Sequence, residues 1–75
     1  MERNVQQDIK AMWDSVHLIV DIIAADKHDA QLDDDVRRNY KHLEIMIGKD
    51  WIIDSGEDLK PFVDCVARAK TWLGE

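Results

Sequence analysis

Apolar residues recur every three or four positions along three stretches of this chain, and this spacing constrains the fold more than any other feature. In the first stretch they are Val5, Ile9, Met12, Trp13, Val16, Val20 and Ile23. Such spacing places the side chains on one face of an α-helix. Asn4 precedes them, and its side chain can accept a hydrogen bond from a first-turn amide. We therefore expect a helix over residues 5–26.

A second helix is expected over residues 33–54. It begins at three consecutive Asp residues, whose carboxylates suit the positive end of a helix dipole. Its apolar stripe is Leu32, Val36, Tyr40, Leu43, Ile47 and Trp51. Gly48 lies within the stripe and costs about 1 kcal/mol relative to Ala, which weakens the helix without ending it. The Ser55–Gly56 pair is the expected stop, because Gly56 can adopt the left-handed conformation.

A third helix is expected over residues 58–73. Asp58 serves as its N-cap, and Pro61 falls in the first turn, where the missing amide hydrogen would have no partner anyway. Its apolar side is Leu59, Phe62, Val63, Val66, Ala69 and Leu73. Gly74 is suited to end the helix.

The three helices with short connections predict a single all-α domain over residues 1–75, a three-helix antiparallel bundle. Pro and Gly total only four residues, which disfavours an all-β fold with many tight turns. A 75-residue chain buries only about 60–65% of the surface that it exposes when unfolded. Because its core is small, we expect oligomerisation to complete it.

The first helix has apolar residues on a second side as well: Ala11, Leu18, Ile22 and Ala25. Two interpretations stay open. The helix is either wrapped by the other two or buried against a second copy or another protein. Ile45 and Trp72 also lie off the stripes of their helices, and Trp is enriched at the centres of interfaces. Leu18, Ile22, Ile45 and Trp72 are therefore the candidate interaction residues.

Acidic residues exceed basic ones, and the formal net charge is −6. The excess is concentrated over residues 26–35, where the acidic residues are Asp26, Asp29, Asp33, Asp34 and Asp35. An acidic surface repels a phosphate backbone, so direct nucleic-acid binding is disfavoured. The same Asp residues suit an inhibitor that mimics nucleic acid in the binding site of another protein.

No motif for catalysis or for a cofactor is recognised, and we expect a protein that is not an enzyme. The acidic segment lacks the glycine and glutamate positions of an EF-hand loop. Asp14, His17 and Asp21 share a helix face, but one helix rarely supplies a complete zinc site. Cys65 cannot form an internal disulfide and suits a reducing compartment. With neither a signal peptide nor the about 20 apolar residues of a membrane span, the sequence predicts a cytoplasmic protein.

The pair Arg37 and His42, separated by four residues, resembles the Arg…His motif of the HEPN family of all-helical ribonucleases. The resemblance implies that Arg37 binds a phosphate and His42 acts in acid–base catalysis, with Arg38 and Lys41 adding phosphate contacts. This chain is shorter than a usual HEPN bundle, and Arg38 stands where a small polar residue is common.

A further resemblance covers residues 38–51, 58–62 and 67–73. These segments, with their "HLEIM…KDW" and "DL.PF" patterns, are similar to the C-terminal part of small helical proteins encoded by bacteriophages and prophages. The likeness suggests a virion-assembly component or a small factor that binds a host protein. We therefore expect a self-associating helical interaction module first, an acidic inhibitor second and a ribonuclease third.

Overall fold

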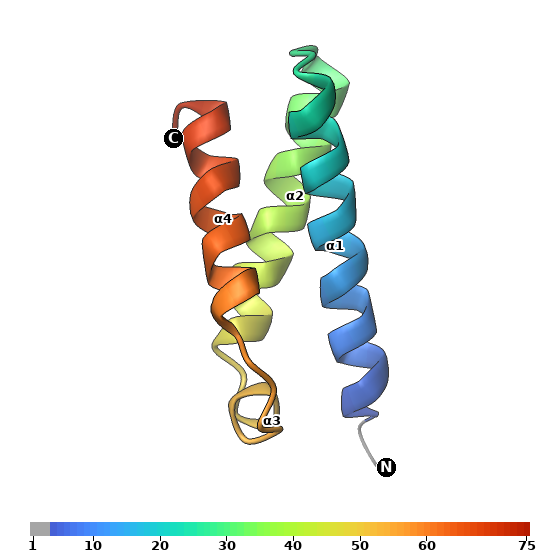
Figure 1. The fold of residues 1–75 in the computed structure, drawn as a ribbon, viewed down its shortest axis with the longest axis vertical. Coiled ribbons are helices and arrows are strands. Elements are labelled where there is room, and N and C mark those ends of the chain that lie inside the picture. The colour runs from blue at the N-terminus through green and yellow to red at the C-terminus, as the bar shows by residue number, and fades with distance from the viewer. Residues whose placement is uncertain (1–3) are drawn as a thin grey trace.

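The computed structural model describes residues 4–75, which fold into three long helices and one single-turn helix without strands (Figure 1). In chain order the helices are α1 (Val5–Ala25), α2 (Ala30–Ile47), α3 (Asp50–Ile53) and α4 (Lys60–Leu73). The expectation of an all-α fold is thus confirmed.

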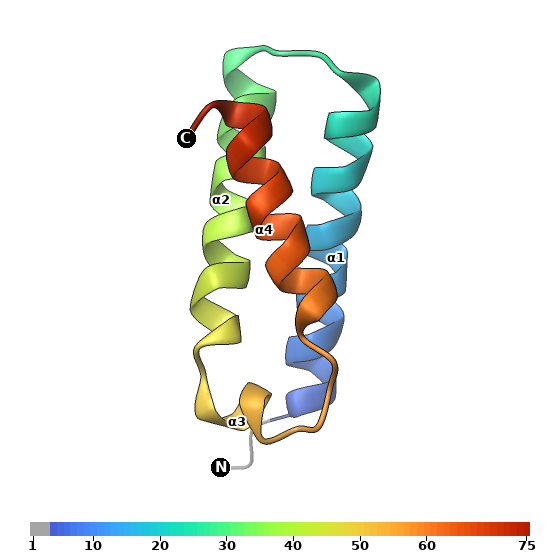
Figure 2. The same ribbon diagram turned by 60° about the vertical axis from the view of Figure 1, so that its left-hand side comes forward.

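α1 and α2 run in opposite directions along the length of the molecule, and α4 runs opposite to α2 (Figure 2). α4 packs against both, but it contacts α2 more extensively than α1. α3 lies at the end of the molecule where α1 begins, and it also contacts α1. α1 therefore has neighbours on two sides.

The bounds of α1 follow from local signals in the sequence. The Asn4 side chain accepts a hydrogen bond from the backbone N–H of Gln7 at 3.1 Å, which confirms it as the N-cap. α1 ends at Ala25, because Asp26 takes a left-handed conformation with φ of 51° and donates its N–H to the carbonyls of Ile22 and Ile23.

The predicted second helix is wrong at both ends. α2 begins at Ala30, because Asp29 is its N-cap and accepts from the Leu32 N–H at 2.8 Å. It ends at Ile47: Gly48 is the C-cap, and Lys49 takes an extended conformation. The expectation that the helix continues through Gly48 is therefore wrong.

α3 is the helical turn that follows this break. It places Ile52 in the core with no exposed surface, and the Trp51 indole N–H donates to the Asp8 carboxylate of α1 at 3.1 Å. Beyond the end of α2, this turn thus adds a buried side chain to the core and a hydrogen bond to α1.

α4 begins two residues later than predicted, at Lys60, with Pro61 in its first turn as expected. The Asp58 carboxylate accepts from the Lys60 N–H at 3.0 Å, although Leu59 occupies the cap position. Gly74 has a φ of 76° and ends the helix, as predicted.

One hydrophobic core draws on all four helices. Its buried residues are Met12, Val16, Ile19, Ile22, Val36, Tyr40, Leu43, Ile52, Phe62, Cys65, Val66 and Ala69. Across residues 4–75, no helix has the length and apolar character needed to cross a bilayer.

Candidate functional site

Two of the residues on the second apolar side of α1 differ in exposure. Leu18 is 41% exposed, whereas Ile22 is 7% exposed and belongs to the core. For Ile22, burial within the chain fits the interpretation in which α1 is wrapped by its neighbours, because α1 packs against both α2 and α4. Ile19, which is fully buried, lies between the two predicted faces and joins them.

The other two candidate interaction residues have different surroundings. Ile45 is 60% exposed on the side of α2 opposite the core. Trp72 stacks on His28 of the α1–α2 connection, with ring centroids 3.9 Å apart and an interplanar angle of 17°. Its indole N–H is buried without a hydrogen-bond partner among the described residues. Trp72 thus closes one end of the molecule, and Ile45 does not contribute to the core.

The acidic residues at the α1–α2 connection contribute to local structure. Asp29 caps α2, and Asp33 lies 3.3 Å from Nδ1 of His28. Asp34 and Asp35 form ion pairs with Arg38 at 3.2 and 2.7 Å. The Asp26 side chain is 80% exposed and lies 4.0 Å from Nε2 of His28. Within the described part of the chain, no three His, Cys, Asp or Glu side chains form a group able to bind a metal ion.

Arg37 and His42 point to different neighbours of α2. Arg37 Nε donates to the Glu75 carboxylate at 2.7 Å, beside α4. His42 Nδ1 lies 3.1 Å from the hydroxyl of the buried Ser15, on α1. Within one chain these two side chains do not converge on a common substrate position, and each has a structural partner.

Glu75 links the end of α4 to α2 through two partners. The Tyr40 hydroxyl donates to its Oε1 at 2.5 Å, and Arg37 forms an ion pair with its Oε2. These hydrogen bonds, from Tyr40 first and then from Arg37, lower the pKa of the Glu75 carboxyl. The negative Glu75 in turn raises the pKa of Tyr40, mainly through the hydrogen bond that the phenol donates. We call these three residues the C-terminal clasp.

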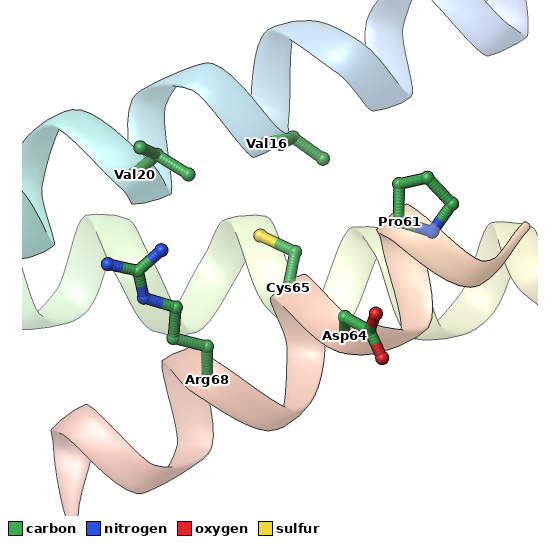
Figure 3. A pocket seen from close by; sticks show the side chains of 6 residues that line it. All are labelled: Val16, Val20, Pro61, Asp64, Cys65 and Arg68. Atoms are coloured by element: carbon green, nitrogen blue, oxygen red, sulfur yellow. The ribbon is translucent and has the colours of Figure 1, made fainter.

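A groove between α1 and α4 is not identifiable from the sequence (Figure 3). It encloses about 170 Å³ and is lined by Val16, Val20, Pro61, Asp64, Cys65 and Arg68. Val16 and Cys65 form its buried floor, and the Cys65 sulfur points toward α1. Burial raises the pKa of the Cys65 thiol, an effect that nearby Arg68 opposes. We refer to this site as the α1–α4 groove.

A second, more open depression lies between α2 and α4. It encloses about 250 Å³ and is lined by Glu44, Ile47, Val63 and Val66. Lys70 Nζ pairs with the Glu44 carboxylate at 2.9 Å and also lies 5.7 Å from the centre of the Tyr40 ring. The charged groups of Glu44 and Lys70 near this depression therefore have partners within the chain.

The sequence alone shows that the residues lining the α1–α4 groove share a face on each helix. Val16 and Val20 are one turn apart on the α1 stripe, and Pro61, Cys65 and Arg68 recur at helical spacing on α4. The spacing predicts which helix face each residue occupies, but it does not predict that a groove remains between the two helices. Comparison with known proteins adds no assignment, since no family model, curated protein or solved structure matches the chain.

Proposed function

We propose that this chain is a small, acidic, non-catalytic helical module for protein–protein interaction, and that it self-associates. The observation that carries the proposal is the α1–α4 groove, an apolar surface that residues 4–75 leave open. In this view α1, α2 and α4 form a three-helix antiparallel bundle that oligomerisation completes.

The physical basis is the small size of the core. A chain of 75 residues has little apolar surface to bury internally, and small helical domains commonly gain stability by association. Covering the groove removes apolar side chains from water, which favours association by roughly 25 cal/mol for each Å² buried.

The surroundings of the polar residues also support a non-catalytic role. Arg37 pairs with Glu75, His42 contacts Ser15, and Asp29 caps a helix. Each of these groups has a structural partner that a reacting substrate would have to displace. The ribonuclease hypothesis, which needs Arg37 and His42 at one phosphate, receives no support from their placement.

The likeness of residues 38–51 to small phage-encoded proteins suggests where such a module acts. An accessory or virion-assembly component inside the host cytoplasm would meet many copies of itself, and assembly proteins work by repeated self-contacts.

An acidic inhibitor that binds a nucleic-acid site on another protein is the second candidate. The exposed carboxylates of Asp26 and Asp34 favour it, since their side chains are 80% and 55% exposed. Such binding would weaken steeply with salt, because charges beyond about 10 Å are screened at 0.1 M. Binding that does not change with salt would exclude this candidate.

The solution mass tests the proposal. Light scattering on a size-exclusion column, over a wide range of concentration, is expected to give at least twice the 8.7 kDa of one chain at the upper end. A mass of 8.7 kDa at every concentration would contradict self-association.

A further inference from the structure

The rim of the α1–α4 groove carries two opposite charges one helical turn apart on α4, Asp64 and Arg68. Both residues are exposed. Although they are four residues apart, their side chains point toward opposite ends of the groove and do not pair with one another (Figure 3).

Several other charged residues of α2 and α4 have ion-pair partners, although Lys41 and Lys60 have none within residues 4–75. The rim is set apart by its position, because its two charges line an apolar groove. Arg37 pairs with Glu75, Arg38 with Asp34 and Asp35, and Lys70 with Glu44. By contrast, neither Asp64 nor Arg68 makes an ion pair or a hydrogen bond within residues 4–75. The two unpaired charges therefore border an apolar groove and are free to meet charges on a partner.

The order of these charges is self-complementary under a two-fold axis. If two copies of α4 pack antiparallel about an axis that passes between positions 64 and 68, position 64 of each copy lies opposite position 68 of the other. Asp64 then faces Arg68 twice. A parallel arrangement would instead place each charge opposite its own kind, which is unfavourable.

We infer that the α1–α4 groove is covered by the same face of a second copy. The result is a symmetric dimer with two reciprocal Asp64–Arg68 ion pairs. The inference rests on the proposed self-association and assigns it an interface. The floor residues Val16, Val20 and Cys65 would be covered, while the charged rim would set the orientation. The exposed Leu18 and Ile45 lie outside this interface.

Single charge reversals test the arrangement. Asp64→Arg leaves two positive charges on each rim, and Arg68→Asp leaves two negative charges. Each variant alone is expected to dissociate with a Kd raised on the order of tenfold or more, because like charges face one another twice. Asp14→Arg, on the outer side of α1, makes the same charge change and is expected to associate as the unmodified chain does.

Mixing the two single variants is the decisive step. The two positive charges on the rim of the Asp64→Arg chain would face the two negative charges on the rim of the Arg68→Asp chain. An equimolar mixture is therefore expected to form a heterodimer. The double variant Asp64→Arg/Arg68→Asp restores both pairs within one sequence and is expected to regain self-association. Restored association also shows that the variants are folded, and far-ultraviolet circular dichroism of each provides an independent check.

The outcomes separate this inference from the proposed function. A monomeric unmodified chain would overturn both. An unmodified chain that associates, with Asp64→Arg associating equally well, would keep self-association and overturn this interface. Single variants that dissociate but fail to combine in the mixture would overturn the reciprocal pairing. Association that occurs only on adding another protein would assign the groove to a different partner and overturn the dimer.

Discussion

The two sides of α4 differ in how the charged groups along them are paired. On the α2 side, Lys70 pairs with Glu44, and the C-terminal clasp joins Glu75 to Tyr40 and Arg37. On the α1 side there is a groove with an apolar floor and, at its rim, two charges that have no ion-pair partner among the described residues. Polar contacts thus fasten α4 to α2, whereas mainly apolar contacts hold it to α1.

This difference indicates which surface is available to a partner. A surface whose charges are paired within the chain gains little from a new ionic contact, since a partner would first have to break the existing pairs. An apolar groove with unpaired charges offers a partner apolar surface to bury, and its charges can set the orientation of that partner. The depression between α2 and α4 is larger than the α1–α4 groove, but Glu44 at its edge is already paired with Lys70. We therefore expect a partner to gain more on the α1 side of α4.

The largest effect is expected from Phe62→Ala, which removes an aromatic contact that holds α4 to α1. Phe62 is fully buried, and its ring centroid lies 4.8 Å from that of Trp13. Its loss should cost about 3–5 kcal/mol in the free energy of unfolding, measured by urea denaturation. Val63→Ala, at a half-exposed neighbouring position, should cost far less; equal losses would contradict the central role of Phe62.

Glu75→Gln should weaken the α2 side in a pH-dependent way. Because the pKa of Glu75 is lowered in the folded chain, its contribution to stability is present above the unfolded value of about 4.3 and is lost as pH falls through the folded pKa. The thermal midpoint of the unmodified chain should therefore fall more on acidification from neutral pH than that of the variant. Glu57→Gln, at an exposed loop position, provides the control.

The same contact can be followed through Tyr40, the only tyrosine of the chain. Its pKa is raised by the bond to Glu75, so ultraviolet titration of the phenol should give a midpoint above the usual value of about 10. The midpoint should move toward that value in Glu75→Gln. An unchanged midpoint would show that the clasp does not form in solution.

The smallest effect is expected in the alkylation rate of Cys65, on the floor of the α1–α4 groove. Burial raises the pKa of its thiol, and the thiolate is the reacting form, so alkylation should be slower than in the urea-unfolded chain. If the groove is covered by a second copy, the rate should fall further as protein concentration rises. A rate independent of concentration in an associating sample would place the interface elsewhere.

Sequence reasoning succeeds where the signal is local. Asn4 and Gly74 bound their helices as expected, because capping depends on a few neighbouring residues. It fails at Gly48, where α2 ends and a separate helical turn places Ile52 in the core. It leaves the burial of Ile22 open, since the width of the buried face depends on how many helices α1 contacts.

The candidate site is less predictable for the same reason. Helical periodicity places Val16 on the apolar face of its helix and Cys65 beside the apolar face of α4. It does not show whether the two packed helices diverge and leave a groove between them. Whether Asp64 and Arg68 find partners depends on the side chains of other elements. Neither property is contained in the spacing of residues along one helix.

The most direct test of the central claim is a dilution series followed by backbone amide resonances. If the chain associates through the α1–α4 groove, dilution should shift the resonances around Val20, Asp64 and Arg68 and leave those around Ile45 unchanged. Shifts confined to the surroundings of Leu18 or Ile45, or a spectrum that does not change on dilution, would contradict the account.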